Sequence, residues 1–79
     1  MRLSEAIRNT RKKALISQKS FAKEINVSSA TVNRWEVGKS KPNINAMNSL
    51  KAFCEKRALP FECIETAWMN DDSQPGKEI

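Results

Sequence analysis

The stretch INVSSATVNRWEVGKSKP, residues 25–42, combines an apolar face, a face of short polar side chains and a basic end. Ser28 is a good N-cap, because its hydroxyl can accept a hydrogen bond from a main-chain N–H of the first turn. Gly38 follows the last apolar position and can adopt the left-handed conformation that ends many helices. The pattern therefore predicts a helix from Ser28 to about Val37, followed by a basic loop over residues 39–42.

Similar signals occur on both sides of this stretch. Ser17 is expected to cap a helix that ends before Asn26, and asparagine suits a tight turn because it tolerates the left-handed conformation. Ser4 and Asn43 are the expected N-caps of a first and a fourth helix, and Pro60 is expected in the first turn of a fifth. The predicted fold class is all-α, a compact bundle of five helices.

The expected core positions are apolar residues that recur every three or four residues. In the first helix, one face carries Leu3, Ile7, Arg11 and Leu15. The second and third helices contribute Phe21, Ala22, Ile25, Val27, Val32 and Trp35. The fourth and fifth contribute Ile44, Met47, Leu50, Phe53, Cys54, Phe61, Ile64 and Trp68. One domain is expected over residues 1–69, and residues 70–79 lack an apolar period and are predicted to be a disordered tail.

The composition limits the possible classes of function. The 79 residues suffice for one small domain, and 14 Lys and Arg against 9 Asp and Glu give a net charge of +5. A basic chain favours a polyanionic partner, through Coulomb attraction and the release of counterions. The chain has no histidine, the commonest general base and metal ligand. Since an acidic pair and a glycine-rich phosphate loop are also missing, we expect no enzyme activity, no cofactor and no metal.

The two cysteines, Cys54 and Cys63, fit neither a CxxC pair nor a zinc-binding pattern. We expect both to be reduced thiols that pack as small hydrophobic side chains, with a disulfide as the alternative. The sequence shows no signal peptide and no apolar run of membrane-spanning length, so a cytoplasmic location is expected.

The predicted third helix has an unusual outward side. Val32 and Trp35 must face the core, and the opposite side is made by Ala30, Asn33, Arg34 and Val37, with Ser29 near the border. A helix that enters a DNA major groove needs such a profile, because small residues allow close approach and Arg and Asn can hydrogen-bond with base edges. The alternative is an ordinary solvent-exposed face, although such faces in basic proteins usually carry several Lys and Glu.

The segment SQKSFAKEINVSSATVNRWEVGKSKP, residues 17–42, resembles the helix-turn-helix of the lambda-repressor-like family, the Cro, phage-repressor and xenobiotic-response-element type. The matching residues are Gln18, Phe21, Ala22, Val27, Ser28, Val32, Trp35, Glu36, Gly38, Lys39 and Pro42. The resemblance extends over about residues 3–68, with the helix-turn-helix at about 17–37. Asn26 stands where the family often has Gly. Ala30 stands where several members carry a longer polar side chain, so it could instead contact a thymine methyl group.

The resemblance implies a double-stranded DNA operator as partner and assigns roles to individual residues. Base edges would be contacted by Ser29, Ala30, Asn33 and Arg34. Phosphates would be contacted by Gln18, Ser28, Thr31, Lys39, Ser40 and Lys41. The alternatives are a phosphate contact for Arg34, a solvated Gln18 and a solvated basic loop.

Arg11 lies on the apolar face of the first helix, where its charge needs a partner. Glu36, on the inner border of the third helix, could reach it, and the family is similar in pairing these two positions. We therefore expect a structural ion pair that joins the first helix to the third.

Together these features predict a transcriptional regulator, a Cro-like or prophage-type repressor that occupies an operator with its third helix in the major groove. Proteins of this design usually bind DNA as two-fold dimers. The dimer surface is expected on the fourth and fifth helices, at Phe61, Ile64 and Trp68. The alternative function is an antitoxin-type module that binds a toxin partner and represses its own operon.

Overall fold

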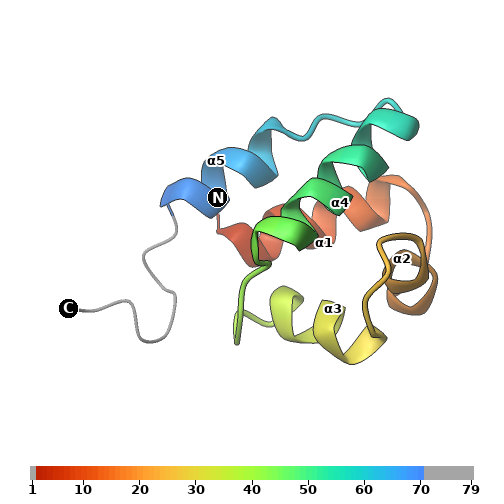
Figure 1. Cartoon of the computed structure of the whole chain (residues 1–79), viewed down its shortest axis with the longest axis horizontal. Coiled ribbons are helices and arrows are strands. Elements are labelled where there is room, and N and C mark those ends of the chain that lie inside the picture. The colour runs from red at the N-terminus through yellow and green to blue at the C-terminus, as the bar shows by residue number, and fades with distance from the viewer. Residues whose placement is uncertain (1, 71–79) are drawn as a thin grey trace.

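Five helices make up most of residues 2–70, the part of the chain that this computed structural model describes (Figure 1). They are α1 (Leu3–Lys13), α2 (Gln18–Glu24), α3 (Ser29–Glu36), α4 (Ile44–Lys56) and α5 (Glu62–Asn70). No strand occurs among the described residues, and the predicted all-α fold is confirmed. Asn70 closes α5, and the rest of the predicted tail lies outside the described residues.

Three of the predicted N-caps are present. The side-chain oxygens of Ser17, Ser28 and Asn43 accept hydrogen bonds from main-chain N–H groups in the first turns of α2, α3 and α4, at 3.1, 3.1 and 2.9 Å. The prediction for Ser4 is wrong, because α1 begins at Leu3 and Arg2 occupies the N-cap position. Pro60 precedes α5 and does not lie in its first turn.

The turn between α2 and α3 depends on Asn26, whose φ of 62° confirms the left-handed conformation expected from the sequence. The Val27 N–H donates to the Ala22 carbonyl at 2.9 Å and the Asn26 N–H donates to the Lys23 carbonyl at 3.3 Å. These two bonds satisfy carbonyls at the end of α2, as in a Schellman motif. The turn is therefore short, and α3 starts at a fixed angle to α2.

The core lies between all five helices and is formed by fifteen buried apolar residues. At its centre, the rings of Phe21 and Phe53 meet edge to face, with centroids 4.9 Å apart. Two predicted core residues are exposed: Leu15 is 89% accessible and Ile44 is 60% accessible. Leu15 lies beyond the end of α1 with a φ of 60°, so its side chain leaves the apolar face, and Ile16 packs against the core instead.

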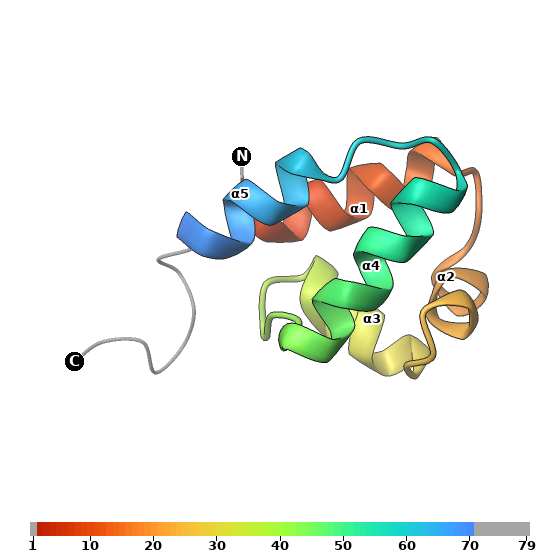
Figure 2. The ribbon, with the colours of Figure 1, turned by 45° about the horizontal axis from the view of Figure 1, so that its top comes forward.

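The arrangement leaves α3 accessible at one side of the molecule. Figures 1 and 2 show α1 and α5 next to each other, with α2 and α3 on the other side of the bundle. The α3–α4 loop, residues 37–43, connects the end of α3 to the start of α4. No helix within residues 2–70 is long and apolar enough to cross a membrane.

Candidate nucleic-acid interface

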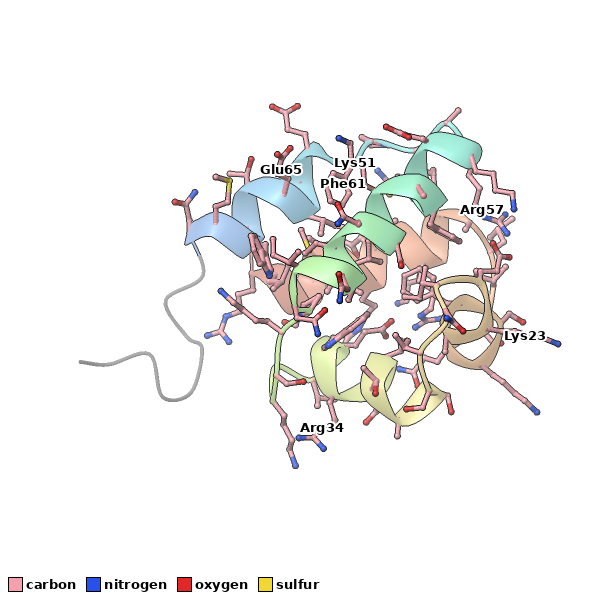
Figure 3. All side chains as sticks on the ribbon, viewed as in Figure 1. Lys23, Arg34, Lys51, Arg57, Phe61 and Glu65 are labelled. Atoms are coloured by element: carbon pink, nitrogen blue, oxygen red, sulfur yellow. The ribbon has the colours of Figure 1, made fainter. Side chains whose placement is uncertain are left out.

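The outward face of α3 carries all four residues for which base contacts were predicted. Ser29, Ala30, Asn33 and Arg34 are each exposed, whereas Val32 and Trp35, on the opposite side of α3, are buried. Figure 3 shows Arg34 extending away from the bundle, on the side opposite Lys51 of α4. The face therefore presents two small side chains near the N-terminus of α3 and two hydrogen-bonding side chains further along.

The end of α3 is fixed by a buried acidic residue, Glu36, which is 2% exposed. Arg11 of α1 donates two hydrogen bonds to its carboxylate, from Nε to Oε2 at 2.7 Å and from Nη2 to Oε1 at 3.0 Å. Because Arg11 donates these hydrogen bonds to the carboxylate of Glu36, the pKa of its guanidinium is raised above its already high usual value. The predicted partners thus form an ion pair that joins α1 to α3, with the arginine charged at any accessible pH.

Two more side chains contact Glu36. Gln18, the first residue of α2, donates from Nε2 to Glu36 Oε1 at 3.1 Å. Arg8 of α1 donates from Nη2 to the main-chain carbonyl of Glu36 at 2.9 Å. Arg8, Arg11 and Gln18 therefore bind Glu36 from two helices, and we call the four residues the Glu36 network. A carboxylate that accepts several charged or amide donors holds the end of α3 against α1 and α2.

The predicted phosphate-contacting residues differ in their exposure and in the hydrogen bonds that they already make within the protein. Gln18 is half-buried and already bonded within the Glu36 network. The hydroxyls of Ser28 and Thr31 lie 2.9 Å apart and share a hydrogen bond at the start of α3. Lys39 is exposed and Ser40 is half-buried.

Lys41 behaves differently from the rest of the loop. Its Nζ donates to the main-chain oxygen of Trp68 in α5 at 3.3 Å, and the ammonium lies 5.2 Å from the centroid of the Trp68 ring. Lys39 is thus the more available of the two loop lysines.

The expected dimer surface needs correction at one residue. Ile64 is fully buried in the core and is not available to a second chain. Phe61 and Trp68 pack partly against the core, whereas Met69 is 69% exposed on α5. The prediction for the cysteines is also wrong in part, because Cys54 is buried but Cys63 is exposed.

Two contacts around α3 and its loop are not predicted from the sequence, one made by Arg8 and one by Lys41. Arg8 stands three residues before Arg11, a spacing that places both on one side of α1, so this spacing could have identified it. The contact between Lys41 and Trp68 joins residues far apart in the sequence, and no local pattern indicates it.

Comparisons with known proteins agree with this geometry. A helix-turn-helix family model matches residues 7–53, more than half of the chain, and the chain belongs to the lambda-repressor-like helix-turn-helix family, a class of DNA-binding regulators. Among solved structures, the fold is similar to that of the P22 c2 repressor, crystallised in complex with synthetic operator 9T in the presence of Tl+. The TM-score is 0.68 and the sequence identity 25%, over 81% of this chain and 92% of the repressor chain. A search of the curated proteins found no match.

Proposed function

We propose that the protein is a sequence-specific repressor that binds double-stranded DNA and acts by occupying an operator. The observation that carries the proposal is the outward face of α3, where Ser29, Ala30, Asn33 and Arg34 are all exposed while Val32 and Trp35 are buried. An α-helix fits the major groove, and Arg pairs with the O6 and N7 atoms of guanine. Asn33 would pair with adenine, and Ala30 would contact a thymine methyl group.

The surroundings of α3 support this proposal. The Glu36 network holds the end of the helix, and the N-cap bond from Thr31 N–H to the Ser28 hydroxyl, 3.1 Å long, fixes its start. A rigid helix reads bases with less loss of conformational entropy on binding than a mobile one. Contacts of Lys39 and Ser40 with phosphates would set the register without reading sequence.

Two copies of the chain would bind a two-fold symmetric operator, with half-sites roughly one helical turn, about 34 Å, apart. Met69 and the accessible parts of Phe61 and Trp68 would contribute to the surface between the copies. Sedimentation of the protein with and without its operator tests this. One copy per DNA duplex at saturation would refute the two-fold arrangement.

The first experiment is selection from a randomised duplex library at about physiological salt, with wild type, Arg34→Ala and Lys51→Ala in parallel. Lys51 is also an exposed cation, but it lies on the opposite side of the bundle from Arg34 (Figure 3). We expect wild type and Lys51→Ala to recover one palindromic motif. Arg34→Ala should relax one position per half-site, a loss of about 1–3 kcal/mol.

Recovery of no motif by the wild type, with only salt-sensitive binding, would contradict sequence reading. A motif that Arg34→Ala and Lys51→Ala alter equally would contradict the role of α3.

A further inference from the structure

Lys41 and Trp68 form a two-way contact between the α3–α4 loop and the end of α5. The Lys41 Nζ donates to the Trp68 main-chain oxygen at 3.3 Å and lies 5.2 Å from the centroid of the indole ring. In return, the indole Nε1–H donates to the carbonyl of Pro42 at 2.7 Å. Both side chains are half-buried, and Pro42 is buried. We call these three contacts the Trp68 clamp.

The chemistry of both partners favours the clamp. The Trp68 carbonyl is among the last four of α5, and such carbonyls have no donor within their own helix. The negative end of the helix dipole also attracts the Lys41 ammonium. A partly buried indole needs an acceptor for its N–H, which the Pro42 carbonyl supplies. The clamp therefore satisfies a donor and an acceptor that would otherwise require water.

The opposite end of the loop is also fixed. The Gly38 N–H donates to the Trp35 carbonyl at 3.2 Å, and the Lys39 N–H donates to the Arg34 carbonyl at 2.9 Å. The main chain of the loop is thus held by α3 where it begins and by Trp68 where it ends. Lys39, the exposed cation of the loop, is the last residue of the first anchor, and only Ser40 separates it from Lys41 in the second.

We infer that Trp68 is a positioning residue for DNA binding, which holds the α3–α4 loop so that Lys39 and Ser40 meet the phosphate backbone. Lys41 then serves the clamp and not a phosphate. This inference rests on the proposed function. A loop without its second anchor would lose more conformational entropy on binding DNA. Because the family match ends at residue 53, DNA affinity would depend on a helix outside the matched helix-turn-helix segment.

The test is a double-mutant cycle with Trp68→Phe and Lys39→Ala in the full chain. Phenylalanine keeps an aromatic ring under Lys41 but lacks the N–H that binds Pro42. The probe is a mixed-sequence duplex of about 20 base pairs, titrated over a range of salt concentrations, since phosphate contacts set the slope of log affinity against log salt. We expect Trp68→Phe to weaken binding roughly 3–10-fold and to reduce that slope by up to about 1. In the Lys39→Ala background, Trp68→Phe should change affinity less than about twofold.

Leu59→Ala is the control. Leu59 is a half-buried apolar residue that packs against the core between α4 and α5, and it takes no part in the Trp68 clamp. It should change the melting temperature but not the salt slope. If Trp68→Phe does not fold, as judged by circular dichroism, Trp68→Tyr replaces it, since its larger side chain fills more of the indole's space.

An equal loss of affinity from Trp68→Phe in the wild-type and Lys39→Ala backgrounds would overturn the inference, as would no loss at all. If wild type and Trp68→Phe bind the duplex with equal affinity, the positioning role of Trp68 is refuted but the proposed function stands. Wild-type protein that does not bind DNA refutes both.

Discussion

Arg11 Nε lies 2.7 Å from Glu36 Oε2, across the interface between α1 and α3, and only 1% of the Glu36 side chain is exposed. A buried carboxylate is stable only with its partners in place, and removal of one partner costs about 3–5 kcal/mol. Glu36→Ala would leave Arg11 and Gln18 without the carboxylate that accepts their hydrogen bonds, and would remove the negative charge 3.9 Å from Arg8 Nε. We expect this variant to lose roughly that amount of stability, and to melt well below wild type.

Thermal unfolding followed by circular dichroism measures this effect. Glu65→Ala is the control, because Glu65 is an exposed carboxylate on α5 (Figure 3). Its melting temperature should stay close to that of wild type. A Glu36→Ala protein that melts with the control would show that the Glu36 network does not stabilise the fold.

The substitution Arg34→Lys tests whether residue 34 recognises a base or contributes only its positive charge to DNA binding. Lysine keeps the positive charge but lacks the planar fork that binds guanine through two hydrogen bonds. Affinity for mixed-sequence DNA and its salt dependence should therefore match wild type. Discrimination at one base pair per half-site should weaken by roughly 1–3 kcal/mol. Unchanged discrimination, measured by competition with single-base variants of the selected motif, would mean that Arg34 contacts only phosphate.

Local signals were sufficient to predict much of this fold. Ser17, Ser28 and Asn43 cap helices because each lies directly before an amphipathic segment, and Asn26 forms a turn because its own conformation permits it. These properties belong to single residues and their neighbours, so the sequence alone indicates them. The exposed face of α3 follows from the same periodicity, because Trp35 fixes which side is buried.

The incorrect predictions concern residues whose position is determined by tertiary contacts and not by local sequence. Periodicity alone cannot show that α1 ends at Lys13, so it predicts Leu15 on a helical face that this residue does not join. The sequence predicts Ile64 both among the core positions and at a dimer surface, and its complete burial leaves only the core position. Lys41 is drawn to the end of α5 by Trp68, which is 27 residues away in the sequence.

Leu15 offers a stabilising substitution. It adopts a φ of 60° and is 89% exposed, so its side chain contributes little packing while its backbone is strained. The left-handed conformation costs an ordinary residue about 1–2 kcal/mol, and asparagine tolerates it better. We expect Leu15→Asn to raise the free energy of unfolding by roughly 0.5–1 kcal/mol. Chemical denaturation measures the change.

Ile44→Asn is the matched control for this substitution. Ile44 is also an exposed apolar residue, but it lies in the helical backbone at the start of α4, where asparagine relieves no strain. Its stability should be equal to or slightly below that of wild type. Equal stabilisation by both substitutions would attribute the gain to lost surface hydrophobicity and not to the backbone of residue 15.

The two cysteines should differ in reactivity and in their response to pH. Burial, with a smaller contribution from Glu55, raises the pKa of the Cys54 thiol above its usual value of 9.0, whereas Cys63 is exposed. A thiol reagent should modify one cysteine in the native protein and both in denaturant, and Cys63→Ser should abolish the native reaction.

The raised pKa of Cys54 also sets the direction of a pH effect on stability. In the unfolded chain the thiol ionises near pH 9.0, while in the folded protein it keeps its proton to higher pH. The unfolded state therefore binds fewer protons above that pH, and the stability that the buried neutral thiol contributes is lost as pH rises further. Comparing the free energy of unfolding of wild type and Cys54→Ala on the two sides of this pH checks the effect. Wild type should lose more stability than the variant, and equal losses would assign the alkaline destabilisation to other groups.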